Sequence, residues 1–187
     1  MIVTAAQELF LDQGYICTTM DMIAERAGVA TSTVYAIFGS KRGILRAIRE
    51  DWHEHSHIRE VTYNSHPSAS PDELLDMLAE ATARQWESGA QVIAIYTGAA
   101  AADPSAAAEL AEAFSGRREG LQIFAHSLES HLRPGMDASH AVAILQALCL
   151  PEVYDELVRR SGWAVEEYQR WLAQILKQEL LGTGRNE

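Results

Sequence analysis

The sequence predicts an all-α fold built from a small helical N-terminal domain and a larger helical domain that follows it. Apolar residues recur at the i, i+3 and i+4 positions of helices along the chain, and no segment alternates as a strand does. Caps and glycine stops divide the first 45 residues into short elements. The acidic charge is uneven: residues 1–53 hold five Lys or Arg and six Asp or Glu, whereas residues 54–187 hold ten and twenty. This asymmetry predicts two regions with different tasks.

The first two helices follow from apolar spacing and from their end signals. The first helix places these apolar residues on one face: Ile2, Ala5, Ala6, Leu9 and Phe10. Gly14 is expected to stop this helix, because glycine tolerates the backbone of a helix end. Thr19 is a good N-cap for a second helix, which is expected to end at Gly28.

A short third helix is expected from about Thr31 to Phe38, three residues after Gly28. Ser40 is expected to cap a fourth helix that begins at Lys41. Two short helices joined by a three-residue turn that contains a glycine are typical of a helix-turn-helix.

The second part of the chain begins after a Ser- and Pro-rich break, NSHPSASP at residues 64–71. Ser70, Pro71 and Glu73 make a strong helix start with a capping box. Further helical regions are expected at about 90–102, 105–132, 138–160 and 164–181, and Pro151 is expected to interrupt the third of these.

The third helix carries side chains for which a buried helix has no use. Its hydroxyl groups come from Thr31, Ser32, Thr33 and Tyr35. Hydroxyl groups bind phosphates and base edges, and a helix of eight residues is about 12 Å long, comparable with the width of the DNA major groove. Lys41 opposes the dipole of the fourth helix, an unfavourable arrangement that a bound phosphate would reverse. These features indicate a helix that reads DNA.

Residues 4–45, TAAQELFLDQGYICTTMDMIAERAGVATSTVYAIFGSKRGIL, resemble the DNA-binding domain of TetR/AcrR-type transcriptional regulators. The matching positions are Ala5, Ala6, Leu9, Phe10, Gly14, Tyr15, Thr18, Thr19, Ile23, Ala24, Ala27, Gly28, Val29, Thr33, Val34, Tyr35, Phe38, Ser40 and Lys41. The resemblance implies a homodimeric repressor that binds a palindromic double-stranded DNA operator and releases it on binding a small-molecule effector. Residues 1–45 would then be the DNA-binding domain, and residues 46–187 a helical domain for ligand binding and dimerisation.

The resemblance also implies which residues touch DNA. Phosphate contacts fall to Thr19, Thr33, Tyr35 and Lys41, and base contacts to the exposed third-helix residues Thr31, Ser32, Ala36 and Ile37. Ile37 stands where relatives often carry histidine, which favours an apolar contact with a thymine methyl group. Ala30 stands where the family often has a capping serine, so Thr31 is expected to cap the helix instead and to shift its start by one residue.

The last two helical regions carry a long apolar stripe that predicts a dimer interface. Its residues are Leu145, Leu148, Tyr168, Trp171, Leu172, Ile175 and Leu176. Two such helices at the end of a chain complete either the core of one protomer or a four-helix bundle with their symmetry mates, and we favour the bundle.

A ligand pocket is predicted where bulky residues give way to alanine and glycine in AIYTGAAAADPSAAAEL, residues 94–110. The residues assigned to it are Trp86, Tyr96, Phe114, Phe124 and Leu145. The small residues either permit close helix packing or leave space for a ligand, and packing is the first explanation for any single aromatic residue. The sequence does not identify the effector.

The remaining motifs exclude several functions. No Ser-His-Asp order, paired carboxylate motif or phosphate-binding glycine loop is present, so no enzyme activity and no cofactor are expected. No metal site is expected, because at most two histidines of WHEHSH share a helix face. Cys17 and Cys149 are expected to be reduced core thiols. Without a long apolar run or a leader segment, the chain is expected to be cytoplasmic and to have no membrane contact.

Two functions from other classes stay open. One is a helical ligand-binding adaptor, and the other is a small helical enzyme, in either of which the helix-turn-helix no longer binds DNA. The near-neutral charge of residues 1–53 keeps the adaptor open, because DNA-binding domains are usually basic.

Overall fold

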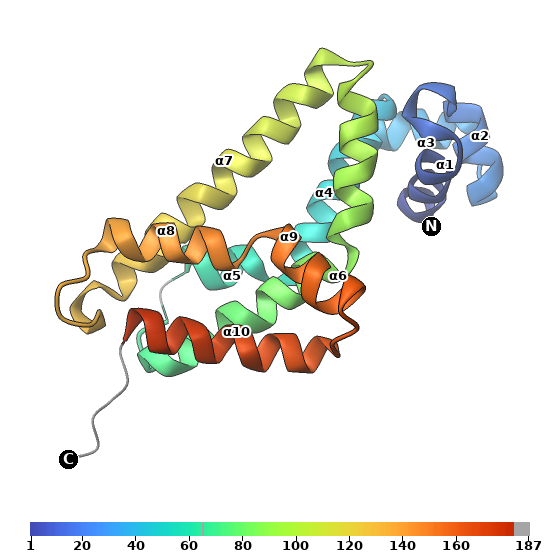
Figure 1. The fold of residues 1–187 in the computed structure, drawn as a ribbon. Coiled ribbons are helices and arrows are strands. Elements are labelled where there is room, and N and C mark those ends of the chain that lie inside the picture. The colour runs from blue at the N-terminus through green and yellow to red at the C-terminus, as the bar shows by residue number, and fades with distance from the viewer. Residues whose placement is uncertain (65, 182–187) are drawn as a thin grey trace. The chain divides into compact units, whose positions relative to one another are not determined.

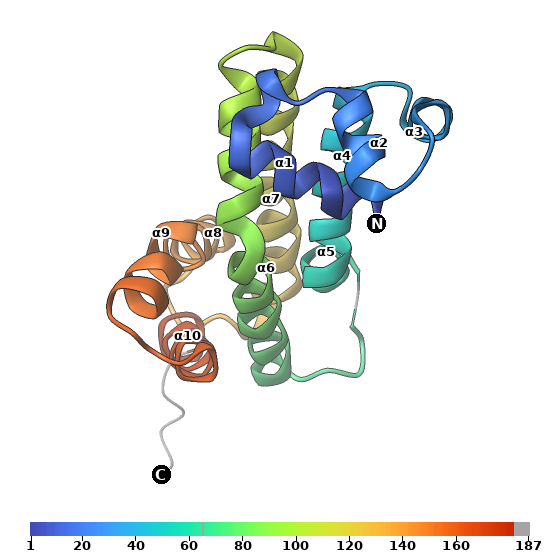
Figure 2. The same ribbon diagram turned by 90° about the vertical axis from the view of Figure 1, so that its right-hand side faces the viewer.

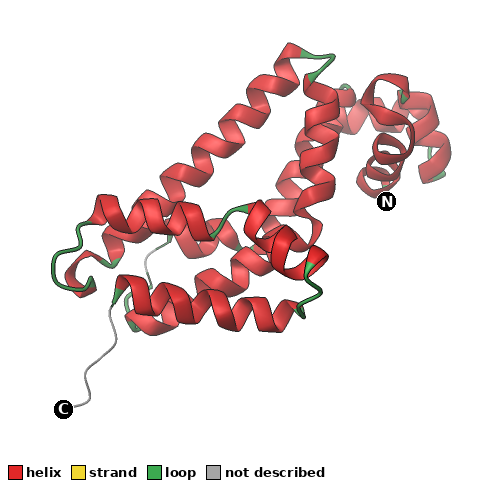
Figure 3. Cartoon of the chain, viewed as in Figure 1, coloured by secondary structure: helices red, strands yellow, loops and turns green. Residues whose placement is uncertain are grey.

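The computed structural model describes residues 1–64 and 66–181, and within these ranges every regular element is a helix (Figures 1 and 3). The elements are α1 (Ile2–Cys17), α2 (Met20–Ala27), α3 (Thr31–Phe38), α4 (Lys41–Ser56), α5 (Ile58–Tyr63), α6 (Pro71–Ala100), α7 (Pro104–Ser127), η1 (Glu129–His131), α8 (Ala138–Leu148), α9 (Pro151–Tyr154), η2 (Asp155–Arg160) and α10 (Val165–Leu180). The predicted all-α fold is confirmed. None of the helices in these ranges has the length and apolar character needed to cross a membrane.

The chain forms two compact units. The first unit combines Met1–Trp52 with Ser88–Phe114, and the second combines His53–Glu87 with Ser115–Glu187. Helices α4, α6 and α7 therefore each contribute residues to both units. The functional division into residues 1–45 and 46–187 stays a prediction, and α4 runs through that boundary without a break.

The first unit is organised around the N-terminal helices. Helix α2 packs against both α1 and α3 (Figure 2). Ile23 of α2 and Val34 of α3 are fully buried in the same apolar cluster as Ile44 of α4. Because short helices have little core to spare, these side chains fix how α3 sits on α2.

Two glycines end helical stretches as predicted. Gly14 interrupts the helical backbone of α1 with φ 84° and ψ 157°. Gly28 ends α2 with φ 67° and ψ 33°, and its N–H donates to the carbonyl groups of Ala24 and Glu25. Both positions need a positive φ, which costs other residues about 1 kcal/mol or more.

The predicted caps are confirmed at three helices and wrong at one. The Thr19 Oγ1 accepts from Met22 N at 3.2 Å, and the Ser40 Oγ accepts from Gly43 N at 3.3 Å. Helix α3, however, begins at Thr31 with Ala30 as its N-cap and has no side-chain cap bond. Ala30 keeps the N-cap place because its extended backbone completes the three-residue turn, so the helix start is not shifted.

The second unit contains the third confirmed cap, a reciprocal capping box at the start of α6. Ser70 N donates to the Glu73 carboxylate at 2.7 Å, and Glu73 N donates to the Ser70 hydroxyl at 3.2 Å. Helix α6 then runs without a break to Ala100, so the region expected at 90–102 is the end of this longer helix. The interruption expected near Pro151 is present, because Leu150 is extended between α8 and α9.

The cysteines differ from the expectation of two core thiols. Cys149 is buried, whereas Cys17 is exposed at the end of α1. The kink at Gly14 explains the difference, because it breaks the helical register that would otherwise continue the buried face of α1.

Candidate nucleic-acid interface

Helix α3 presents most of its length to solvent from a firmly held position. Val34 is fully buried and holds the helix to the core, whereas Tyr35 is 52% exposed and Ile37 is 61% exposed. The other predicted contact residues are also accessible: Thr19, Ser32, Thr33 and Ala36 are exposed, and Thr31 is half-buried. The predicted contact residues of α3 thus have surface to offer, and one buried anchor fixes their orientation.

Thr19 lies at the N-terminus of α2, where the helix dipole favours an anion. Its hydroxyl oxygen already accepts the bond from Met22 N, so the hydroxyl hydrogen stays available to donate. A side chain in this state caps its own helix and can donate to a phosphate oxygen at the same time.

Lys41 makes contacts that the sequence did not reveal. Its Nζ donates to the carbonyl of Tyr15 at 2.5 Å and to that of Ile16 at 3.3 Å, and it lies 4.4 Å from the centre of the Tyr15 ring. Burial lowers the pKa of this ammonium group. Lys41 thereby ties α4 to the end of α1, and one of its three N–H groups remains for another acceptor.

The basic residues of α4 also have a partner within the first unit. Arg46 donates to the Glu109 carboxylate at 2.8 Å, and the Nε of Arg42 lies 4.0 Å from the same group. Tyr96 donates to the Leu45 carbonyl at 3.1 Å, and its hydroxyl lies 3.5 Å from Glu109. The buried carboxylate of Glu109 therefore offsets part of the positive charge at the start of α4.

Residues 2–48 match the family model described as bacterial regulatory proteins, tetR family. The match is confined to α1, α2, α3 and the first half of α4, and this segment is similar to tetR-family proteins. A curated relative, the HTH-type transcriptional regulator HbdR of Aromatoleum sp. (strain CIB), is 38% identical over 69 residues. That match covers 35% of this chain and 30% of HbdR, so the chain matches less than a third of the length of this relative.

Solved structures share the fold along almost the whole chain. The SmeT–triclosan complex has a TM-score of 0.76 at 21% identity and covers 98% of this chain and 91% of its own. NalD, the secondary repressor of the MexAB-OprM multidrug efflux pump in Pseudomonas aeruginosa, has a TM-score of 0.69 at 22% identity and covers 100% and 95%. FadR, a fatty acid degradation regulator of Bacillus halodurans, has a TM-score of 0.67 at 19% identity and covers 100% and 95%.

The residues predicted to line a ligand pocket lie in both units. Tyr96 and Phe114 belong to the first unit, where Tyr96 is buried and Phe114 is 47% exposed. Trp86, Phe124 and Leu145 belong to the second unit and are buried. The assignment of these five residues to one ligand pocket stays a prediction.

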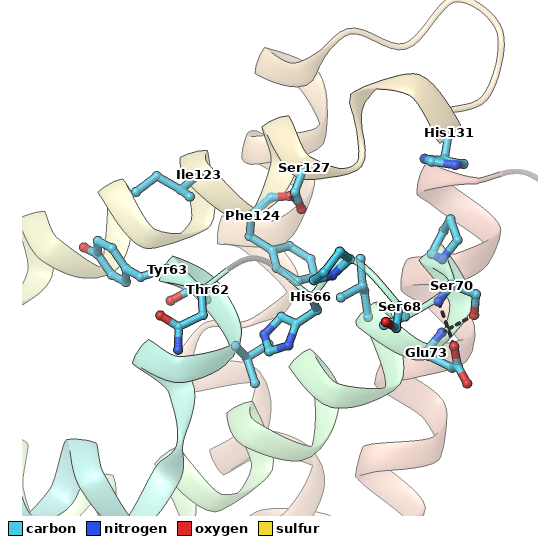
Figure 4. A pocket seen from close by; sticks show the side chains of 16 residues that line it. Thr62, Tyr63, His66, Ser68, Ser70, Glu73, Ile123, Phe124, Ser127 and His131 are labelled. Atoms are coloured by element: carbon cyan, nitrogen blue, oxygen red, sulfur yellow. Dashed lines mark hydrogen bonds between the residues drawn. The ribbon is translucent and has the colours of Figure 1, made fainter.

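Phe124 lines an open cavity of about 700 Å³ in the second unit (Figure 4). The ring projects from α7 toward the segment that precedes α6, which contributes His66 and Ser68. Glu73 also lines the cavity, but its carboxylate is held by the capping bond from Ser70. The wall thus combines loop residues with polar and apolar side chains of α5, α6 and α7, and its one carboxylate already has a structural task.

The predicted dimer residues divide into two sets by exposure. Four of them are completely buried within the single chain: Leu145, Tyr168, Leu172 and Leu176. The remaining three keep part of their surface: Leu148, Trp171 and Ile175. The first set packs inside the protomer, so only the second set has area to give to a partner. Dimerisation through α8 and α10 stays a prediction.

Proposed function

We propose that this chain is a TetR-family transcriptional regulator, in particular a repressor that binds a palindromic operator as a homodimer and is released by a small molecule. One observation carries the proposal: α3 is held by the buried Val34 while Tyr35 and Ile37 project into solvent. Two large side chains exposed on a rigid short helix have no role in the fold of the protomer, and a DNA groove would use both.

Each exposed residue receives a role from its chemistry. Thr19, Thr33 and Tyr35 donate hydroxyl hydrogens to phosphate oxygens, and Lys41 adds its remaining N–H and its positive charge. Ser32 and Thr31 bond to base edges, while Ala36 and Ile37 contact thymine methyl groups. Phosphate contacts fix the position of the helix, and base contacts select the sequence.

The dimer in this proposal uses the half-exposed side chains of α8 and α10. Leu148, Trp171 and Ile175 are apolar and keep surface in the protomer. Two protomers related by a two-fold axis would bury these side chains together and present two copies of α3 to a palindrome.

Release by an effector requires a helix that is shared by the ligand-binding and DNA-binding regions and that can shift between two positions. Helix α4 runs unbroken from Lys41 to Ser56 and contributes to both units, so a shift at one end is carried to the other. Because the duplex fixes the spacing of its half-sites, a displacement of a few ångströms prevents both α3 helices from binding at once. Effector and DNA then weaken each other reciprocally, by about 1–3 kcal/mol.

Selection of bound duplexes from a random DNA pool tests the proposal. The wild-type protein is expected to enrich a palindrome, and Ile37→Ala is expected to relax the preference for thymine at one position of each half-site. Tyr63→Phe is the matched control, because this exposed tyrosine lies in the second unit. A pool that gains no common sequence would contradict the proposal and favour the ligand-binding adaptor or a small enzyme.

A further inference from the structure

A partly buried arginine of the second unit has no carboxylate of the described residues within ion-pair distance. Arg117 of α7 is half-buried, and its Nη2 donates to the carbonyl of Cys149 at 2.7 Å. Its guanidinium carbon lies 5.9 Å from the centre of the Trp86 ring. Within residues 1–64 and 66–181, no Asp or Glu oxygen forms an ion pair with it, although the protein carries 26 acidic residues.

The carbonyl that Arg117 contacts does not require a cation. Cys149 O already accepts from the indole Nε1 of Trp86 at 3.0 Å. A neutral donor thus satisfies the end of α8, and a buried guanidinium costs free energy that one further bond to a carbonyl recovers only in part. Burial accordingly lowers the pKa of Arg117. The carboxylate of Glu152 opposes this shift from a longer range, and no carboxylate of the described residues forms an ion pair with the guanidinium.

Two buried hydroxyl groups near Arg117 also lack an oxygen or nitrogen partner. The hydroxyl of Tyr168, on α10, is completely buried and unpaired in the described part of the chain, and Tyr168 and Arg117 interact electrostatically. The hydroxyl of Thr82, on α6, has no oxygen or nitrogen partner among the described residues, and it interacts with the Cys149 thiol. Buried polar groups without partners are rare in native proteins, and each one needs an explanation.

These groups come from three helices and converge on Cys149. A guanidinium fork binds both oxygens of a carboxylate, and a phenol donates to the same group. Apolar side chains lie one helical turn away on the same elements: Leu145 precedes Cys149 by four residues, and Leu172 follows Tyr168 by four, and both are fully buried. A ligand with an anionic head and an apolar body matches this combination.

We propose that Arg117 and Tyr168 bind the carboxylate of an apolar carboxylic acid and that this acid is the effector. The inference rests on the proposed function for the effector role, but the binding site itself does not depend on DNA. Arg117 supplies the charge and the paired N–H groups, Tyr168 donates a hydroxyl hydrogen, and the indole of Trp86 covers the guanidinium face.

Calorimetric titration of the full chain without DNA tests the site. The probes are octanoate and 4-phenylbutyrate, each paired with its neutral alcohol, 1-octanol and 4-phenylbutanol. Each acid is expected to bind at least about tenfold more tightly than its alcohol, because a charge-assisted pair adds to the same apolar contact. Arg117→Gln is expected to remove that difference, and Tyr168→Phe to reduce it about threefold or more.

Arg118→Gln is the matched control, because its side chain is the next along α7 and is exposed. If Arg117→Gln does not fold, as judged by circular dichroism, Arg117→Lys keeps the charge and removes the fork, and it is expected to lower acid affinity severalfold. Equal affinities for acid and alcohol would overturn the inference, and so would unchanged acid affinity in both Arg117→Lys and Tyr168→Phe.

A separate titration of operator DNA distinguishes the two proposals. If DNA binds and no probe shows the acid preference, only the carboxylate site is wrong. If the acids bind through Arg117 and no duplex binds, the site stands and the regulatory function is wrong.

Discussion

Removing the hydroxyl of Tyr96 is expected to destabilise the first unit, and the structure sets the size of the effect. This hydroxyl donates to the Leu45 carbonyl at 3.1 Å and lies 3.5 Å from the Glu109 carboxylate. Both Tyr96 and Leu45 are essentially fully buried, so water does not replace the lost donor. Burial is also the main reason that the pKa of Tyr96 is raised.

The magnitude follows from the bonding of each acceptor. A buried hydrogen bond contributes about 1 kcal/mol, with a larger share when one partner is charged. The Leu45 carbonyl lies inside α4 and still accepts a hydrogen bond from the helix backbone in the variant, so the free energy lost at this acceptor is modest. Glu109 keeps the bond from Arg46 but loses a nearby donor. We expect Tyr96→Phe to lower the free energy of unfolding by about 1–2 kcal/mol, which for a chain of this length lowers the melting temperature by about 2–8 °C.

Thermal unfolding followed by circular dichroism measures this effect. Tyr35→Phe is the matched control, since the same atom is removed from a side chain that is half exposed, and it is expected to stay within about 0.5 kcal/mol of wild type. If the two variants melt together, the bond from Tyr96 to α4 does not stabilise the protein, and our account of how α4 is held is wrong.

Three further outcomes follow from burial and backbone geometry. At pH 8 a thiol reagent is expected to label the exposed Cys17 quickly and to leave Cys149 unmodified until the protein unfolds, because burial raises the pKa of Cys149 to about 11; equal labelling rates would contradict this. Gly28→Ala is expected to lower the free energy of unfolding by about 1 kcal/mol in urea titrations, because φ is 67° there. Light scattering is expected to give a mass of about 41 kDa, twice that of the 20.6 kDa chain, and a monomeric wild type would refute the dimer. Ile175→Glu should yield a folded monomer, whereas Leu176→Glu should unfold the protein because Leu176 is fully buried.

Features that depend on neighbouring residues were predictable from the sequence. The caps at Thr19 and Ser40, the capping box at Ser70 and the helix stop at Gly28 each involve partners within four residues along the chain. The exposure of Tyr35 also follows from helical spacing, because it lies beside the buried Val34. Local chemistry is enough in all of these cases.

Features that depend on distant residues were not predictable in this way. Glu109 contacts Arg46 across 63 positions, and Lys41 contacts the carbonyl of Tyr15 across 26. No local pattern marks either pair, because the partners meet only through the packing of helices. The expected cap at Thr31 failed for a related reason: the turn before α3 is set by packing on α2 and not by the best capping side chain.

The apolar stripe of α10 shows a further limit. Its helical spacing predicted burial correctly, yet Tyr168, Leu172 and Leu176 are buried within the protomer itself. Hydrophobic periodicity reports that a face is covered, and it does not report which chain covers it.

The central claim is that α3 of this chain binds DNA, and fluorescence anisotropy of a labelled duplex tests it most directly. The selected palindrome is titrated with protein at several salt concentrations. The account predicts one dimer per duplex, an affinity that falls linearly with salt on logarithmic axes, and weaker binding to all sequences for Tyr35→Phe because a phosphate contact is lost. Binding that is absent for every duplex at low salt, or that is the same at all salt concentrations, would contradict it.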